Sequence, residues 1–285
     1  MKSVLTIGKF EGIHLGHRAL LREVSNRAKT ESLKPVVLVF KPHPFKFLHD
    51  KDYKPIFSEQ EREKLLREFV NEIVTLDFDT ELMSMKASDF CKKLFTELNA
   101  GEIVVGESYR FGNNREGTVE TLREAAAEYK AKIHVVKNVD NISTSSIRDL
   151  LSENKFPEAE KLLGFPFFIE GEVTKGRQIG RVLGFPTLNL YPPEDKFLPP
   201  YGVYKTRTIT INGETLPGLT NIGIRPTVDE SANLSVETHI PGLTGEMYGR
   251  QIKVEFLQFI RAEKRFENPE ALILQIKEDL KRSGE

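Results

Sequence analysis

Short apolar runs alternate with amphipathic stretches over the first half of the chain. The apolar runs have the length of buried strands and lie at residues 4–7, 36–40, 73–78, 103–105 and 133–136. The stretches between them repeat apolar residues with a helical period, near residues 15–30, 59–71, 87–98 and 118–130. Ser58 and Glu61 have the spacing of a capping box at the start of one helix. This alternation predicts an α/β domain, a parallel sheet with helices on its faces.

The pattern changes after about residue 155, where a short helix is expected over 156–163. Strand-like runs then follow one another, at residues 167–174, 203–211, 214–222, 234–240 and 251–260. Asn212-Gly213 is a hairpin signal, and Asn268-Pro269 favours the start of a last helix. We expect a small antiparallel β-barrel with a terminal helix. The predicted domains are residues 1–155, a linker helix over 156–165, and residues 166–285.

Composition narrows the class of protein. The 285 residues are 39% hydrophobic and 29% charged with a net charge of −1, which is typical of a soluble globular protein. No broad basic field favours nucleic acid, and no apolar run reaches membrane-spanning length. The one cysteine, Cys91, excludes an internal disulfide and is expected in the core. With no leader pattern at the start, we expect a cytoplasmic protein, a monomer or a weak homo-oligomer.

The segment from Gly8 to His17 carries the strongest chemical signal. It follows an apolar run and precedes a helical pattern, so it predicts a strand, a turn and a helix N-terminus. Glycines at positions 8, 12 and 16 let a ligand approach the backbone, and the first turn of a helix binds phosphate. His14 and His17 share a helix face and can donate to the same phosphate oxygens. This combination predicts a nucleotide site.

Three further segments of the first half could join this site. His43 lies in a turn between two prolines, directly after the second strand. Ser108, Tyr109, Arg110 and Phe111 follow the fourth strand, where aromatic rings could stack on a flat ligand and Arg110 could pair with phosphate. By themselves these two turns are also explained by ordinary packing. Ser145, Ser146 and Arg148 belong to a hydroxyl-rich helix start that exceeds what capping requires.

The second half contains a glycine-rich basic loop after its first strand. The loop has the character of a phosphate cradle and includes Lys175, Gly176, Gly180 and Arg181. Thr187 and Asn189 follow it and, being two apart, face the same side of an extended chain. Two neutral oxygens can complete the shell of a phosphate-bound Mg²⁺, which takes few protein ligands.

These segments together resemble a known family. The turn is similar to the H-x-G-H motif of nucleotidylyltransferases, and the longer segment from Gly8 to His17 is similar to the corresponding motif of bacterial FAD synthetases. The three further segments of the first half are similar to other motifs of the same synthetases, F-x-P-H-P, V-V-G-x-[DN]-[FY]-x-F-G and I-S-S-[ST]-x-[IV]-R. Residues 175–189 resemble the riboflavin kinase module, whose signature is G-[RK]-x-[LI]-G-F-P-T-A-N, and residues 221–227, 236–239, 247–249 and 259–266 also match it. The chain thus resembles the bifunctional bacterial riboflavin kinase/FAD synthetase family. Lys9, Glu11, Ser108 and Leu188 depart from the usual residues.

The resemblance implies a Rossmann-like nucleotidylyltransferase domain that adenylylates FMN to FAD and a barrel that phosphorylates riboflavin to FMN, both with ATP. It implies catalytic roles for His14, His17, Arg148 and Glu237. It implies Mg²⁺ on Thr187 and Asn189. The implied ATP-binding residues are Gly8, Phe10, Gly12, Gly16, Ser145, Ser146, Lys175, Gly176, Gly180, Arg181, Thr187 and Asn189. The implied flavin-binding residues are His43, Ser108, Tyr109, Arg110, Phe111, Arg225 and Arg261.

Three alternatives remain open at this point. The chain could retain only one of the two activities. It could be a related H-x-G-H transferase that makes another nucleotide conjugate and uses the barrel only for binding. It could also be a flavin-binding regulator derived from an enzyme, an interpretation that Lys9 and Ser108 favour and that the intact His14, His17 and Glu237 oppose.

Overall fold

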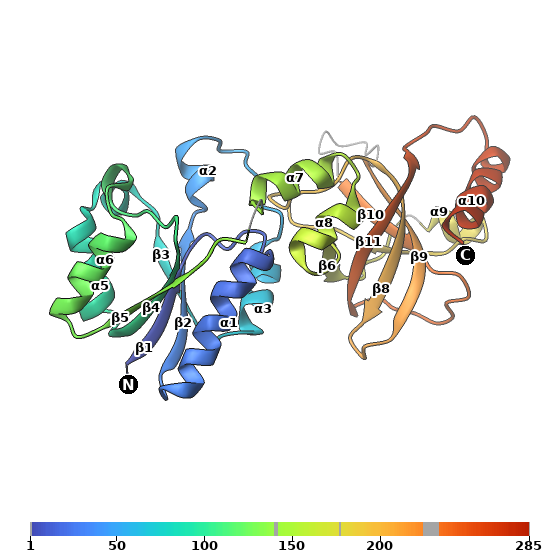
Figure 1. Cartoon of the computed structure of the whole chain (residues 1–285). Coiled ribbons are helices and arrows are strands. Elements are labelled where there is room, and N and C mark those ends of the chain that lie inside the picture. The colour runs from blue at the N-terminus through green and yellow to red at the C-terminus, as the bar shows by residue number, and fades with distance from the viewer. Residues whose placement is uncertain (1, 140–141, 177, 225–233, 285) are drawn as a thin grey trace. The chain divides into compact units, whose positions relative to one another are not determined.

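The computed structural model describes residues 2–139, 142–176, 178–224 and 234–284. By packing, the chain divides into two compact units, Met1–Thr144 and Ser145–Glu285. Each unit has one sheet, and Figure 1 labels their elements. Within the described part, no helix combines the length and the apolar character needed to cross a membrane.

The first unit is built on a parallel sheet of five strands in the order β3-β2-β1-β4-β5 (Figure 1). The strands are β1 (Ser3–Ile7), β2 (Lys34–Lys41), β3 (Glu72–Asp77), β4 (Ala100–Gly106) and β5 (Lys132–Val136). The strand order reverses between β1 and β4, and open sheets bind ligands at the carboxyl ends of strands beside such a point. The turns after β1, β2 and β4 therefore lie at one edge, as the alternation of elements predicts.

Helices cover both faces of this sheet, α1 and α3 on one face and α5 and α6 on the other (Figure 1). The helices of this unit are α1 (Leu15–Thr30), α2 (Pro44–Leu48), α3 (Glu59–Arg67), α4 (Thr80–Ser84), α5 (Ala87–Thr96), the 3₁₀ turn η1 (Asn113–Arg115) and α6 (Val119–Glu128). The capping box of Ser58 and Glu61 is confirmed at the start of α3. α2 and α4 escaped prediction because five residues are too few to show a helical period.

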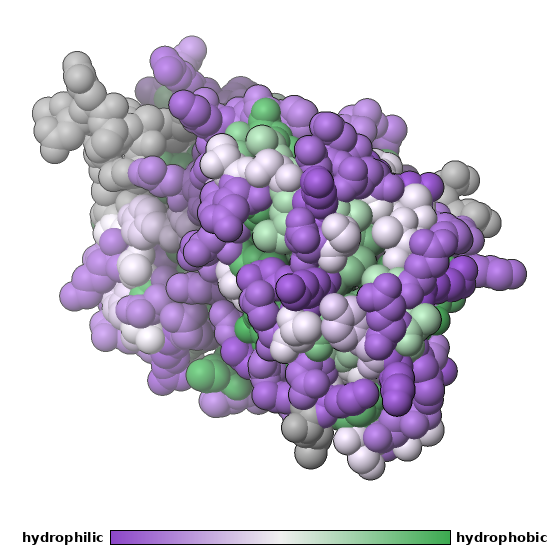
Figure 2. All heavy atoms as spheres, turned by 90° about the vertical axis from the view of Figure 1, so that its left-hand side faces the viewer, coloured by the Kyte–Doolittle hydropathy of each residue, from purple (hydrophilic) through white to green (hydrophobic). Residues whose placement is uncertain are grey.

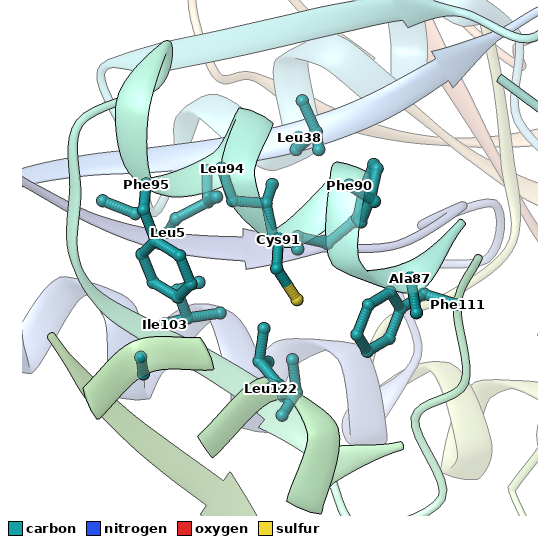
Figure 3. Packing of buried hydrophobic residues seen from close by; sticks show 14 of the residues in the cluster. Leu5, Leu38, Ala87, Phe90, Cys91, Leu94, Phe95, Ile103, Phe111 and Leu122 are labelled. Carbon is teal, nitrogen blue, oxygen red and sulfur yellow. The ribbon is translucent and has the colours of Figure 1, made fainter. Parts of the chain in front are cut away.

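Cys91 lies in the core between α5, α6 and the sheet, among Leu38, Phe90, Leu94 and Leu122 (Figure 3). It is 1% exposed, and burial raises the pKa of its thiol to about 11. The expected packing role of this cysteine is thus confirmed.

The outer face shown in Figure 2 is mainly hydrophilic, with apolar residues in small separate patches, in keeping with the composition.

The second unit contains an antiparallel sheet of six strands in the order β6-β11-β8-β9-β10-β7. The strands are β6 (Phe168–Glu172), β7 (Thr187–Leu190), β8 (Gly202–Thr210), β9 (Thr215–Ile224), β10 (Leu234–His239) and β11 (Gln251–Ala262). Thr174, just after β6, pairs with Asn189 of β7, so the two edges of the sheet meet and the sheet curls into a barrel. The hairpin at Asn212-Gly213 joins β8 to β9, and Gly213 has the positive φ of +79° that such a turn needs.

The helices in the described residues of the second unit are α7 (Thr144–Ser152), α8 (Phe156–Leu163), α9 (Ile179–Val182) and α10 (Pro269–Ser283). Asn268 caps α10 as expected, accepting a 2.8 Å hydrogen bond from the Ala271 amide. The ring of Phe156 in α8 lies 5.4 Å from the ring of Tyr204 and 5.9 Å from that of Phe256. Phe156 is 2% exposed, so α8 contributes to the core of the barrel.

This packing predicts that a fragment over residues 145–285 is more stable than one over 165–285. The shorter fragment lacks Phe156, and deleting a buried phenylalanine side chain costs roughly 3–5 kcal/mol. Urea unfolding followed by circular dichroism measures the difference. The Phe156→Ala variant of the longer fragment is the matched control and should lose most of the same stability. Equal unfolding midpoints for both fragments would contradict this prediction.

Candidate active sites

The turn after β1 is held by two buried side chains. Phe10 and Ile13 have φ angles of 45° and 44°, the left-handed region that costs energy for residues other than glycine. Both side chains are fully buried and stabilise the turn. A Cβ atom added at Gly8 would lie 3.1 Å from the Phe10 ring, so glycine permits this close packing. The turn therefore enters α1 in one defined conformation.

His14 and His17 meet at the N-terminus of α1. His14 is the N-cap residue, and its Nδ1 accepts a hydrogen bond of 3.3 Å from the His17 amide. The two imidazole rings are stacked, with centroids 3.7 Å apart and planes inclined by 18°. The Nδ1 atom of His17 is buried and has no hydrogen-bond partner among the described residues. An unpartnered imidazole nitrogen beside a helix N-terminus suits a phosphate ligand.

Both imidazoles are uncharged at neutral pH. Burial lowers the pKa of His14 to about 4. Burial also lowers the pKa of His17 well below its usual value of 6.5, and the nearby His14 and Lys9 lower it further. Because Nδ1 of His14 accepts a hydrogen bond, its proton resides on Nε2. His14 can thus donate a hydrogen bond without carrying a charge.

Glu11 connects this turn to the turn after β2. Its buried carboxylate accepts hydrogen bonds of 2.9 and 2.7 Å from the Tyr53 hydroxyl and one of 3.3 Å from the Ile56 amide. Nε2 of His43 lies 3.2 Å from Glu11 Oε2, and Nδ1 of His43 accepts from the Phe45 amide at 3.3 Å. The first two predicted turns are therefore in direct contact. Glu11 is a departure from the usual aspartate, but it retains a carboxylate that contacts three neighbouring groups, on Tyr53, Ile56 and His43.

The segment after β4 divides between core and surface. Phe111 is 7% exposed, and its ring lies 5.7 Å from Phe90 and 5.4 Å from Tyr109. Arg110 and Ser108 are exposed, and the Ser108 hydroxyl accepts a 3.3 Å hydrogen bond from Asn138. In this conformation the ring of Phe111 packs in the core, while the two polar side chains of the segment face solvent.

The hydroxyl-rich helix start is α7, which the packing assigns to the second unit from Ser145 onward. Ser145 and Ser146 lie in its first turn, and Ile147 is fully buried. The guanidinium carbon of Arg148 lies 4.9 Å from the centre of the Phe197 ring. The predicted helix is confirmed here.

Strand register assembles the residues predicted for the second site. Glu237 of β10 lies directly opposite Asn189 of β7, and His239 lies opposite Thr187. Opposed residues of antiparallel strands point to the same face, as do residues two apart. Thr187, Asn189 and Glu237 consequently share one face. Leu188 pairs with Thr238 and lies on the other face, so this departure leaves the polar row intact.

The glycine-rich basic loop packs over this row. A Cβ atom at Gly176 would clash with the side chain of Asn189, so only glycine allows the loop to approach it. Asn189 is 3% exposed, and its Nδ2 donates a 3.3 Å hydrogen bond to the Thr187 carbonyl. A pocket of about 360 Å³ opens here, and its lining includes Gln178, Arg181, Thr187, Asn189, Met247 and Tyr248. Gly180 lies in α9, and the Lys175 ammonium is 5.7 Å from the centre of the Tyr248 ring.

Of the two arginines that the sequence predicts to bind flavin in the second unit, only Arg261 lies among the described residues. Arg225 lies outside the described residues. Arg261, at the end of β11, forms an ion pair of 2.8 Å with Asp279 of α10, and its Nε donates to the same carboxylate. Asp279 is 1% exposed, so this pair attaches the terminal helix to the sheet.

The sequence did not reveal two residues that contact predicted site residues. Tyr53 is 42 positions from Glu11, and no motif marks it. Phe197 is 49 positions from Arg148, in the connection between β7 and β8. Neither contact has a periodic or local signal, because each forms only when distant segments meet in the fold.

Comparison with known proteins identifies the two halves separately. Residues 1–148 match the FAD synthetase family, and residues 163–285 match the riboflavin kinase family. The described residues contain no group of three acidic, histidine or cysteine side chains placed to hold a metal ion.

Relatives of similar length carry both domains. The bifunctional riboflavin kinase/FMN adenylyltransferase of Escherichia coli K12 is 35% identical over 283 residues, covering 97% of this chain and 90% of the relative. The protein of that name from Listeria monocytogenes is 32% identical and covers 98% of this chain and 90% of the relative. A crystal structure of a Streptococcus pneumoniae protein, described as a macrolide-efflux protein, has a TM-score of 0.86 and 29% identity, covering 99% of this chain and 94% of that one.

The family matches occur in the order that the sequence motifs predict, and each falls on the unit with the corresponding sheet. The parallel sheet holds the stacked histidines, and the curled antiparallel sheet holds the polar row. The chain therefore belongs to the family of bifunctional riboflavin kinase/FMN adenylyltransferases.

Proposed function

We propose that the chain catalyses two successive reactions of flavin cofactor synthesis with the residues described above. In the barrel, riboflavin and ATP give FMN and ADP. In the α/β domain, FMN and ATP give FAD and pyrophosphate. The observation that supports the kinase assignment most directly is the register that sets Glu237 opposite Asn189, beside a pocket lined by Thr187.

In the kinase reaction, Glu237 takes the proton from the ribityl hydroxyl as that oxygen attacks the terminal phosphate of ATP. The hydroxyl of Ser235 donates to Glu237 Oε1 at 3.3 Å and helps to orient it. Lys175, Gly176, Gly180 and Arg181 belong to the loop that binds the phosphates. The loop approaches Asn189 closely because Gly176 has no side chain.

The residues of the proposed metal site fit Mg²⁺, because their side chains offer oxygen donors. The Thr187 hydroxyl and the Asn189 amide oxygen are neutral oxygens on one face of β7. Mg²⁺ at nucleotide sites takes few protein ligands and completes its shell with phosphates and water. When bound, the ion would offset the charge of the transferred phosphoryl group.

In the adenylylation, the phosphate oxygen of FMN attacks the α-phosphorus of ATP, and pyrophosphate leaves. No covalent enzyme intermediate is required, so catalysis depends on holding the triphosphate and stabilising the charge that develops. His14 and His17 supply uncharged donors at the N-terminus of α1. We assign Ser145, Ser146 and Arg148 to the same triphosphate, with Gly8, Phe10, Gly12 and Gly16 forming the turn around it.

The flavin of the adenylylation is assigned to the edge of the parallel sheet, where the turns after β2 and β4 end. Glu11 and Tyr53 hold His43 in place there. Ser108, Tyr109, Arg110 and Phe111 complete the proposed set, with the exposed Arg110 placed to meet the flavin phosphate. Arg225 and Arg261 are assigned to flavin in the kinase domain.

Glu237→Gln should abolish phosphorylation of riboflavin and leave FAD formation from supplied FMN unchanged. The substitution removes a base from the barrel and alters nothing in the α/β domain. Chromatographic separation of the flavins after incubation with ATP and Mg²⁺ measures both reactions in one preparation. Normal FMN production by the variant would refute the role of Glu237.

The double substitution of His14 and His17 by alanine should have the opposite effect: FMN accumulates and FAD does not form. Losing donors to developing charge lowers kcat by roughly two to three orders of magnitude per donor. The kinase activity of the same sample shows that the barrel is folded, and its far-UV circular dichroism, if equal to that of wild type, shows that the α/β domain is folded as well. Wild-type FAD formation by the double variant would exclude the histidine turn as the adenylylation site.

The low pKa of His14 has a consequence for stability. The unfolded histidine titrates near 6.5 and the folded one near 4, so between these values the unfolded chain binds more protons. The free energy of unfolding should therefore decrease by up to about 3 kcal/mol from this group as the pH falls from 7 to 4. Urea unfolding of wild type and His14→Gln at several pH values isolates the effect, because the variant lacks it. Parallel curves for the two proteins would contradict the assigned pKa.

A further inference from the structure

The glycine-rich basic loop of the barrel ends in a segment that folds back on itself, residues 180–186. The amide of Phe185 donates a 2.7 Å hydrogen bond to the carbonyl of Gly180. A Cβ atom added at Gly180 would clash with the carbonyl oxygen of Phe185 and would lie 3.5 Å from the Thr187 methyl group. The segment therefore has a compact form that requires glycine at position 180, and it leads directly into β7.

His239 attaches this segment to β10. Its Nδ1 atom lies 2.9 Å from the carbonyl oxygen of Pro186, and its ring meets the Phe185 ring edge to face, with centroids 5.4 Å apart. Because a carbonyl oxygen can only accept, the histidine donates this hydrogen bond from Nδ1. In the strand pairing, His239 lies opposite Thr187, the residue that follows this carbonyl. One side chain thus holds both the closing segment of the loop and the start of β7.

The side-chain hydrogen bond lies where main-chain pairing stops. The register of β7 and β10 ends at the pair of Thr187 and His239, and Pro186 has no amide hydrogen with which to extend it. Little burial supports the segment: Arg181 is exposed, and Val182 is 86% exposed. A segment with so few buried apolar contacts opens easily, so its closed form depends on specific hydrogen bonds.

We propose that His239 is a positioning residue for the phosphorylation of riboflavin and acts by keeping the glycine-rich loop in its phosphate-binding form. This inference rests on the proposed role of the loop in binding ATP. When only a fraction of the molecules holds the binding form, the apparent affinity for the ligand falls by that fraction. Since the histidine acts through the loop, its loss should weaken ATP binding more than it slows the chemical step.

The test compares two amides in the full-length protein, His239→Asn and His239→Gln. The asparagine amide nitrogen takes the place of the histidine Nδ1, whereas the glutamine amide lies one carbon further from the main chain. We expect His239→Gln to raise KM for ATP in riboflavin phosphorylation by roughly 3- to 10-fold, the range of one hydrogen bond, with kcat and KM for riboflavin close to wild type. His239→Asn should recover most of this loss. FAD formation from supplied FMN should be unchanged in both variants.

Limited proteolysis adds a measurement that does not depend on activity. The exposed Arg181 offers trypsin a cleavage site inside the segment. Cleavage follows the population of the open form when opening is fast, so His239→Gln should be cut after Arg181 roughly 3- to 10-fold faster than wild type. His239→Asn should be cut at nearly the wild-type rate, and mass spectrometry identifies the fragments. Equal rates for wild type and the glutamine variant overturn the inference.

Gly180→Ala separates this inference from the proposed function on which it rests. The added methyl group displaces the closing segment, so KM for ATP should rise, and adding His239→Gln should then have little further effect. If Gly180→Ala keeps the wild-type KM for ATP, the loop does not bind the phosphates, and the inference fails with that assignment. If Gly180→Ala is impaired but His239→Gln is not, only the positioning role is overturned. Equal losses for the asparagine and glutamine variants, or additive effects in the double variant, also overturn it.

Discussion

Pairing of the short strand β7 with β10 is the interaction on which the barrel and its site depend. It adds the last strand of the sheet, and Asn189 of that strand then pairs with Thr174 beyond the opposite edge strand. The same hydrogen bonds determine which side chains meet, because a shift of one residue would move each to the other face. Glu237 reaches Asn189 and Thr187 only in the observed register. The pairing of β7 with β10 therefore both closes the sheet and brings the side chains of the polar row together.

In the α/β domain, the order of the strands brings distant segments of the chain together. Placing β1 between β2 and β4 brings their carboxyl ends together, so segments about thirty to one hundred positions apart share an edge. Within that edge, burial determines the chemistry of the histidines. Their rings are stacked and poorly solvated, and both pKa values fall. The turn thus combines uncharged hydrogen-bond donors with a helix N-terminus, two features that suit an anion.

Along the chain, the boundary of the family match and the boundary of the packed units do not coincide. α7 carries residues assigned to the nucleotide of one reaction, but from Ser145 onward it packs with the unit that contains the barrel, and its Arg148 lies on the ring of Phe197. A chain of aromatic contacts runs from Arg148 through Phe197 to the buried Phe167.

The sequence alone predicted both architectures, most elements, the capping box, the hairpin turn and the family, because these depend on local periodicity, turn chemistry and contiguous motifs. Element ends differed, as at α3, which stops at Arg67 instead of 71, and four short elements were missed, namely α2, α4, α9 and β7. Only the tertiary structure decided that Glu11 binds Tyr53, that Phe111 packs inward, that Arg261 engages Asp279 and that Arg148 lies on Phe197. These contacts join residues far apart in the chain, and their partners are selected by strand register and packing, which no local pattern encodes.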